Sequence, residues 1–246
     1  MEKNDDILNS VSWGEAARKL LANLEKIIPG LPAVMILRHS ERGEILDPSN
    51  IDIDLTPRGL RVAYEFGIGL PLEHTYCFFH SPVTRCRETA EKIMEGFQKK
   101  GGTIKSFKPM VSLSKIRISD ITEEERTRFR REIFDHIANN RWSDVLMKLI
   151  SGYFPPKNLS QMYQERAQLT ALEVLKILSK ASPSDIIIFV SHDLHIAFYL
   201  FYWAGILQTE RIQFLDGFIF QYFDDNVTFL HRDIKKEDIA PSWMKN

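Results

Sequence analysis

The chain has 246 residues, of which 44% are hydrophobic and 26% charged, which is close to an ordinary globular composition. A core of normal size is therefore available, and wholesale disorder is excluded. Lys and Arg number 32 against 33 Asp and Glu, so there is no general basic surface for nucleic acid, and any anion site must be built locally. The two cysteines, Cys77 and Cys86, are too few for a disulfide framework or a Cys-rich zinc site.

The N-terminal segment predicts one amphipathic helix. Its first ten residues are polar and acidic and lack the apolar segment of a signal peptide. Ser12 and Glu15 have the spacing of a capping box, and leucines and isoleucines at helical intervals follow as far as Pro29. We expect residues 1–31 to pack on the main domain through this helix. The most apolar later stretch, 196–207, is shorter than the ~20 residues that a membrane helix needs, so we expect a cytoplasmic protein that does not bind membranes.

Short apolar runs then alternate with helical patterns. Four runs are of strand length and are typical of buried strands: residues 33–37, 75–79, 103–107 and 185–190. Two Ser/Thr-Pro pairs are typical of an N-cap followed by proline at the first helical position, and open predicted helices: Thr56-Pro57 and Ser81-Pro82. This alternation predicts an α/β fold with three layers, in which a mostly parallel central sheet has helices on both faces.

The second half of the chain departs from this alternation and then returns to it. From about Ser112 to Pro156 the sequence is dense in both charges and predicts helices without a strand, which we interpret as an insertion over the C-terminal ends of the strands. Leucines from Leu169 to Leu178 predict a long amphipathic helix. Residues 218–223 and 227–231 predict a closing hairpin. We expect residues 32–246 to form a single domain that contains this insertion.

The chemistry-bearing residues follow the predicted strands. In α/β sheets, ligands bind beyond the carboxyl ends of the strands. The loops at those ends carry three arginines, two histidines and a carboxylate, namely Arg38, His39, Arg42, Arg85, His192 and Asp193. A guanidinium group matches phosphate oxygens bidentately. The sequence therefore predicts a phosphate site that is built from side chains, without a glycine-rich loop, a cofactor or a metal ion.

The same residues resemble the histidine phosphatase superfamily, which includes the phosphoglycerate mutases and the histidine acid phosphatases. Four sequence blocks of that superfamily occur here in the family's order, at Arg38-His39-Ser40, Leu55–Gly59, Ser81–Arg85 and Ser191-His192. Ser40 departs from the pattern, because the family has glycine there. A serine is small enough to fit beside a phosphate, and its hydroxyl could donate a hydrogen bond to it.

The resemblance implies a role for each of these residues. His39 would be the nucleophile that takes the phosphoryl group, and Arg38, Arg85 and the catalytic His192 would bind the phosphate oxygens. Arg42 falls where the acid-phosphatase-like branch carries a further phosphate-binding arginine.

The resemblance leaves the general acid open. Asp193 matches the His-Asp pair of the acid-phosphatase-like branch, whose Asp protonates the leaving alcohol. The mutase-like branch instead carries a Glu before or within the insertion, where residues 113–117 of this chain hold none. Asp120 lies just beyond that stretch and is the second candidate, after Asp193.

The predicted function is therefore that of a metal-independent phosphomonoester hydrolase with a covalent phosphohistidine intermediate. Its substrate would be a small phosphorylated metabolite or a phosphoprotein. Two alternatives stay open: a phosphomutase, and a catalytically silent member of the same fold that binds phosphate or protein. The long substrate segments of the glycolytic mutases are not evident, and the chain keeps the nucleophile and the arginines that silent members typically lose. Neither the substrate nor the oligomeric state follows from the sequence.

Overall fold

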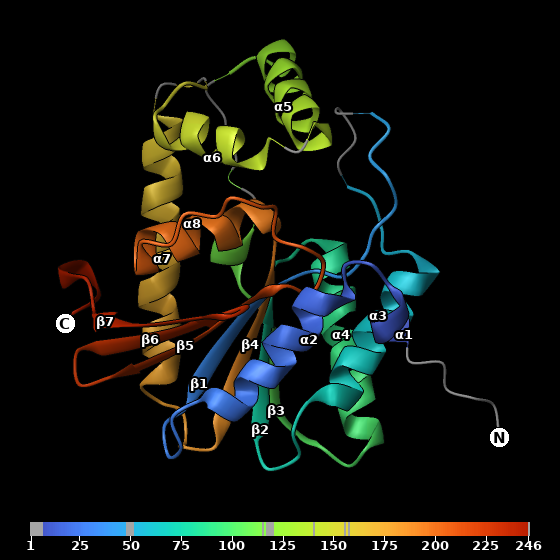
Figure 1. The fold of residues 1–246 in the computed structure, drawn as a ribbon, viewed down its shortest axis with the longest axis vertical. Coiled ribbons are helices and arrows are strands. Elements are labelled where there is room, and N and C mark those ends of the chain that lie inside the picture. The colour runs from blue at the N-terminus through green and yellow to red at the C-terminus, as the bar shows by residue number, and fades with distance from the viewer. Residues whose placement is uncertain are drawn as a thin grey trace.

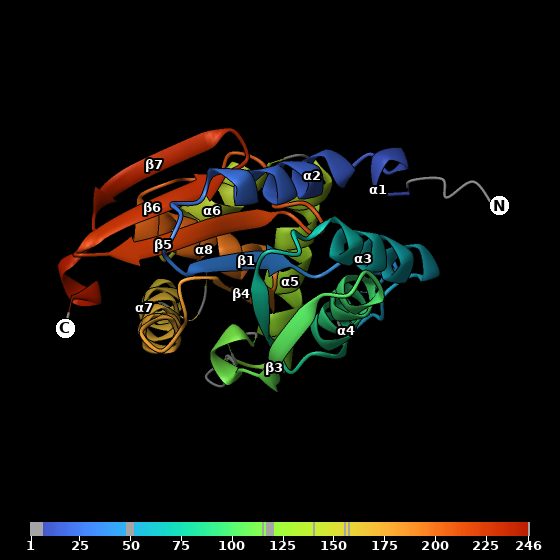
Figure 2. The ribbon, with the colours of Figure 1, turned by 90° about the horizontal axis from the view of Figure 1, so that it is seen from below.

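The computed structural model describes residues 7–47, 52–114, 116, 121–139, 141–154, 156 and 158–245. Its centre is a seven-stranded sheet in the order β3-β2-β4-β1-β5-β6-β7, with helices on both faces (Figures 1 and 2). The strands are β1 Ala33–Arg38, β2 Thr75–His80, β3 Thr103–Pro109, β4 Asp185–Ser191, β5 Gly217–Phe223, β6 Asn226–His231 and β7 Ile234–Ile239. The α-helices are α1 Ile7–Ser10, α2 Gly14–Ala22, α3 Pro57–Gly69, α4 Thr84–Lys99, α5 Glu123–Ala138, α6 Trp142–Ile150, α7 Leu159–Leu178 and α8 Asp193–Ala204. Within these ranges no helix has both the length and the apolar character needed to cross a membrane.

The sheet is mixed, so the prediction of a mostly parallel sheet is only partly correct. Strands β1, β2, β3 and β4 pair in parallel, whereas β5 runs antiparallel to β1, and β6 and β7 continue antiparallel. The predicted hairpin between β5 and β6 is present. Asp224 and Asp225 form its two-residue turn with φ of 48° and 61°, which are the positive values that such a tight turn requires. Strand β7 was not predicted, because four of its six residues are charged and no apolar alternation marks it.

The central strands have apolar side chains on both faces, which creates two hydrophobic cores. Because successive side chains of a strand point to opposite faces, Val34 and Ile36 of β1 face one core while Met35 and Leu37 face the other. Helices α7 and α8 cover the first face, and α2, α3 and α4 cover the second. Figure 2 shows the two helical layers on either side of the strands. This double burial explains why the strand predictions for β1 and β4 were reliable.

Two helix starts differ from the prediction, and both concern a serine. Helix α2 begins at Gly14 after Trp13, so Ser12 is not its N-cap. Helix α4 begins at Thr84, two residues after the predicted start, and Ser81 does not cap it. The predicted cap of α3 is confirmed, because the side chain of Thr56 accepts a hydrogen bond from the backbone N–H of Gly59.

Helix α7 is present as predicted, but only the second half of its leucine stripe faces the core, where Leu178 is buried and Leu175 packs. Leu169 and Leu172 are 49% and 46% exposed. The helix begins ten residues earlier than Leu169, and its buried face carries smaller side chains such as Ala167, Ala171 and Val174. Small residues allow α7 to approach α8 and the sheet closely, so the leucine spacing was correct for the end of the helix and wrong for Leu169 and Leu172.

The segment that was predicted as a helical insertion contains α5 and α6. In Figure 1 these two helices lie together beyond the sheet, near the start of α8. Phe129, Ile133 and Val145 form a third hydrophobic cluster with Phe198 of α8, and Leu194 packs against it. The insertion is therefore attached to the helix whose first residue is Asp193.

Candidate active site

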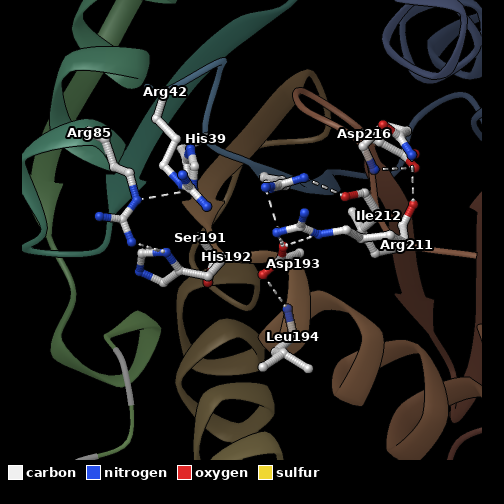
Figure 3. Close-up of polar contacts among 12 residues, drawn as sticks. His39, Arg42, Arg85, Ser191, His192, Asp193, Leu194, Arg211, Ile212 and Asp216 are labelled. Atoms are coloured by element: carbon white, nitrogen blue, oxygen red, sulfur yellow. Dashed lines mark hydrogen bonds and ion pairs between the residues drawn. The ribbon is translucent and has the colours of Figure 1, made fainter. Parts of the chain in front are cut away.

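Three neighbouring strand ends bring the predicted site residues together. In the parallel pairs, Arg38 of β1 lies opposite Ser191 of β4, and His80 of β2 lies opposite Val190. The residues that follow these strands, beginning with His39 and His192, therefore start from one edge of the sheet. Figure 3 shows His39, Arg85 and His192 side by side there, with Asp193 and Arg211 next to them.

His39 is held as a neutral imidazole with one ring nitrogen available. Its Nδ1 lies 2.8 Å from the carbonyl oxygen of Ser40, which can only accept, so Nδ1 carries the proton. The other nitrogen, Nε2, accepts a hydrogen bond of 3.1 Å from Nε of Arg85. Burial lowers the pKa of His39 well below its usual value, and the charges of Arg38 and Arg85 lower it further. Nε2 is therefore unprotonated near neutral pH, and its lone pair accepts from Arg85 in this structure.

Arg85 and His192 form the second part of the site. Arg85 lies in the first turn of α4, and its Nη2 is 3.4 Å from Nδ1 of His192 (Figure 3). The Nε2 atom of His192 is 3.2 Å from the hydroxyl of Ser81, so this serine orients the imidazole instead of capping α4. Nη1 of Arg85 also faces Asp52, at 3.7 Å, although the side chain of Asp52 is 76% exposed. Both residues that were predicted to bind phosphate here are buried side by side.

Arg38 is buried and held from several sides. Its Nη1 donates to the carbonyl of Ile212 at 2.7 Å, its Nη2 lies 3.2 Å from Oδ2 of Asp193, and its guanidinium is 4.1 Å from the ring centre of Phe214. Burial lowers the pKa of Arg38 to about 9, and Asp193 opposes that shift. Its Nε has no hydrogen-bond partner among the described residues. A buried donor without an acceptor costs about 1–3 kcal/mol, so this atom is a candidate donor to a ligand.

Arg42 belongs to the same group of charges. Its Nη1 donates to the carbonyl of Gly43 at 2.7 Å, and burial lowers its pKa to about 10, with Arg211 and Arg85 acting in the same direction. The carboxylate of the preceding residue, Glu41, is directed to Thr56 and Arg58. Arg42 therefore adds positive charge to the site.

Ser40 and Gly59 together fix the backbone beside the nucleophile. The backbone N–H of Ser40 donates to Oγ1 of Thr89 at 2.9 Å, and its hydroxyl donates to the carbonyl of Gly59 at 2.7 Å. The hydroxyl is thus directed to α3, and not to a phosphate beside His39. A Cβ at Gly59 would lie 2.1 Å from the carbonyl oxygen of Glu41, so only glycine allows this close approach. The sequence block around Gly59 therefore has a structural role.

Asp193 is held as a carboxylate by two arginines, one of which the sequence analysis missed. Nε and Nη2 of Arg211 lie 2.8 and 2.6 Å from its Oδ2, and its Oδ1 accepts from the backbone N–H of Leu194. Burial would raise the pKa of Asp193, but Arg38 and Arg211 outweigh it and hold that pKa well below the usual range. A general acid must carry a proton, so this arrangement favours a carboxylate at Asp193; the acid role remains a prediction. Asp120, the second candidate, lies outside the described residues.

Arg211 escaped prediction because it does not follow a strand. It lies in the loop between α8 and β5, and only the antiparallel pairing of β5 with β1 brings that loop to Arg38. No local signal marked it, because the predicted residues already held three arginines against the single carboxylate of Asp193. The described residues, those of the site included, contain no group of three or more His, Cys, Asp or Glu side chains that could hold a metal ion.

Comparison with known proteins establishes the family. The sequence profile of the histidine phosphatase superfamily (branch 1) matches residues 34–215, and the chain belongs to this superfamily of phosphatases and mutases. The His192-Asp193 pair, which resembles the acid-phosphatase-like branch, is therefore a local feature of a branch 1 chain. No curated protein sequence matches the chain.

Solved structures show the fold. A phosphoglycerate mutase from Bacillus anthracis is 14% identical with a TM-score of 0.50, covering 84% of this chain and 91% of its own. A phosphoserine phosphatase from Entamoeba histolytica is 16% identical with a TM-score of 0.49, covering 87% of this chain and 100% of its own. A mycobacterial glucosyl-3-phosphoglycerate phosphatase is 13% identical with a TM-score of 0.49, covering 84% of this chain and 96% of its own. The match to the Bacillus anthracis phosphoglycerate mutase shows that the mixed sheet and its helical layers form a phosphoglycerate mutase-like fold.

Proposed function

We propose that the protein is a metal-independent phosphomonoester hydrolase that transfers the phosphoryl group first to His39 and then to water. The observation that carries this proposal is the state of His39: it is buried and neutral, and its Nε2 lone pair faces the guanidinium of Arg85. An imidazole in this state is a nucleophile, and its arginine neighbours attract a phosphate dianion.

In the first step, the Nε2 lone pair of His39 forms a bond to phosphorus, and the bond between phosphorus and the ester oxygen breaks. The leaving oxygen takes the electron pair and a proton from solvent water, and departs as an alcohol. The proton on Nδ1 of His39 stays at the carbonyl of Ser40, which disperses the positive charge that the ring acquires. In the second step, water attacks the phosphohistidine, returns the electron pair to Nε2 and releases inorganic phosphate.

Arginines supply the stabilisation that both steps need. The transferring group carries negative charge on its three equatorial oxygens, and preplaced donors lower its energy without reorganisation. Arg85 has guanidinium nitrogens next to both His39 and His192, and Arg38 offers a buried Nε that lacks a protein acceptor in the described part of the chain. These groups can replace the positive charge that a metal ion supplies in other phosphatases.

We propose a phosphorylated small molecule as the substrate class. The insertion packs against Phe198 and Leu194 of α8, the helix whose first residue is Asp193. Phosphopeptides belong in the same substrate panel, because a phosphoprotein would present the same phosphomonoester group.

The experiment is a comparison of wild type and His39→Gln on 4-nitrophenyl phosphate, without added metal, followed by a panel of phosphorylated metabolites and phosphopeptides. His74→Gln is the matched control, because His74 lies at the opposite end of β2 from the site. We expect phosphate release by wild type and by the control, and its loss in His39→Gln with an unchanged circular dichroism spectrum. Release by His39→Gln within tenfold of wild type would overturn the proposal.

A further inference from the structure

The loop between α8 and β5 contacts the buried guanidinium of Arg38 on several sides. The carbonyl of Ile212 accepts from Nη1 of Arg38, and the ring of Phe214 stacks on its guanidinium. The loop is itself anchored, because the carbonyl of Asp216 accepts from the backbone N–H of Arg38 at 2.9 Å, and the Asp216 side chain pairs with Arg232 at 2.8 Å. The contacts of Arg211 therefore belong to a fixed piece of structure.

The carboxylate of Asp193 connects this loop to Arg38. Three guanidinium nitrogens lie within 3.2 Å of its Oδ2: Nη2 of Arg38, and Nε and Nη2 of Arg211 (Figure 3). Its Oδ1 accepts from the N–H of Leu194 in the first turn of α8. Cationic donors therefore surround Oδ2, and this favours the ionised form of the carboxyl.

We propose that Arg211 is a positioning residue of the phosphatase reaction: through Asp193, which acts as a fixed anion, it holds Arg38 in place and balances the carboxylate charge. The inference rests on the proposed function, because it gives Arg38 its task of binding phosphate. Without Arg211, the buried charge of Asp193 would repel the incoming phosphate dianion. With Arg211 present, Asp193 orients Arg38, and the ion pair between Asp193 and Arg211 adds no net charge to the site.

The electrostatic surroundings of Asp193 agree with this role. It is faced by Arg38 and His39 at the end of β1, by Arg42 in the following loop, by Arg211 before β5, and by the buried Tyr163 of α7. Burial raises the pKa of Tyr163, so its hydroxyl remains neutral. The groups around Asp193 are thus cationic or neutral, and they favour the ionised carboxylate.

The first test measures binding of orthovanadate, a phosphate analogue, by calorimetry to the whole protein. We expect Arg211→Gln to weaken binding about tenfold, which is less than the ~10²–10³ that the loss of a direct donor costs in rate. Arg211→Lys should restore part of the affinity. The double variant Arg211→Gln, Asp193→Asn should bind vanadate more tightly than Arg211→Gln alone, because the unbalanced negative charge is gone. The matched control is Glu210→Gln, in the same loop and 77% exposed.

The second test separates a positioning carboxylate from a general acid. A fixed anion predicts that Asp193→Asn lowers kcat/KM by similar factors for 4-nitrophenyl phosphate and for an alkyl phosphate. A general acid predicts a selective loss of ~10²–10⁴ for the alkyl phosphate, whose leaving group needs a proton. Wild-type vanadate affinity in Arg211→Gln, or a selective loss in Asp193→Asn, would overturn the inference. Retained phosphate release by His39→Gln would instead overturn the proposed function, so the two failures are distinguishable.

Discussion

Replacing Arg85 by glutamine removes a guanidinium that contacts both imidazoles of the site. Nε of Arg85 lies 3.1 Å from Nε2 of His39, and its Nη2 lies 3.4 Å from Nδ1 of His192. A phosphate bonded to His39 would therefore have Arg85 at its side. Loss of a preorganised donor to a developing oxyanion costs about 2.7–4 kcal/mol, or ~10²–10³ in kcat, and we expect a loss of this size in Arg85→Gln.

The same substitution should also change the pH dependence. Burial, then Arg38, then Arg85 lower the pKa of His39. His39 must be neutral to attack phosphorus, so activity is lost as the pH falls through the pKa of this histidine in the folded enzyme. Removal of Arg85 removes one cause of the lowering, and the pKa of His39 rises. The acid limb of kcat/KM against pH should therefore move to higher pH in Arg85→Gln.

The assay is the release of 4-nitrophenol, measured over a pH series for wild type, Arg85→Gln and Arg87→Gln. Arg87 is the matched control, because it is in the same helix but is half exposed and pairs with Glu91 at 3.0 Å. We expect Arg87→Gln to keep the wild-type rate and profile. An Arg85→Gln variant within tenfold of wild type, or an acid limb that stays in place or moves to lower pH, would refute the assignment of Arg85 beside the nucleophile.

Further predictions follow from the packing and charge of the site. Gly59→Ala places a Cβ against the carbonyl of Glu41, so the free energy of unfolding should fall by about 1–3 kcal/mol. Urea unfolding measures this as a lower midpoint, and an unchanged midpoint would contradict the close approach of Gly59 to Glu41. EDTA should leave the rate of phosphate release unchanged, and micromolar vanadate should inhibit it. If EDTA abolished phosphate release and Mg²⁺ restored it, the arginine-based mechanism would be contradicted. The folded protein holds the pKa of His39 below its unfolded value, so stability should decrease as the pH falls below about 6.5. His39→Gln should show a smaller decrease, and an equal decrease in both proteins would contradict the burial of a neutral imidazole.

The sequence was most informative where local chemistry sets the structure. Strands β1 and β4 are buried on both faces, so an unbroken apolar run marks each of them. The motif residues at the ends of these strands, such as His39 and His192, could be placed at one edge because parallel pairing brings strand ends together. The prediction of Thr56 as a helix cap was correct because its side chain accepts a hydrogen bond from Gly59, three residues further along the chain.

Long-range packing decided the features that the sequence could not predict. Ser81 has the sequence context of a helix cap, but its hydroxyl bonds to the imidazole of His192, which follows a strand that is distant in the chain. Leu169 lies at helical spacing from other leucines but is exposed, because α7 packs through smaller side chains such as Ala167 and Ala171. Arg211 lies far from any motif, and it reaches the site only because β5 pairs with β1. In each case the partner is remote in the chain, and local spacing carries no information about it.

The most direct test of the central claim is to trap the phosphoryl group on the enzyme. Wild-type protein mixed rapidly with ³²P-labelled phosphate ester and quenched in alkali, where phosphohistidine survives, should carry label that peptide mapping assigns to His39. The label should be lost on mild acid treatment and absent from His39→Gln, whereas His74→Gln should be labelled like wild type. Label that survives acid, or that maps to a residue other than His39 while wild type turns over, would contradict the account.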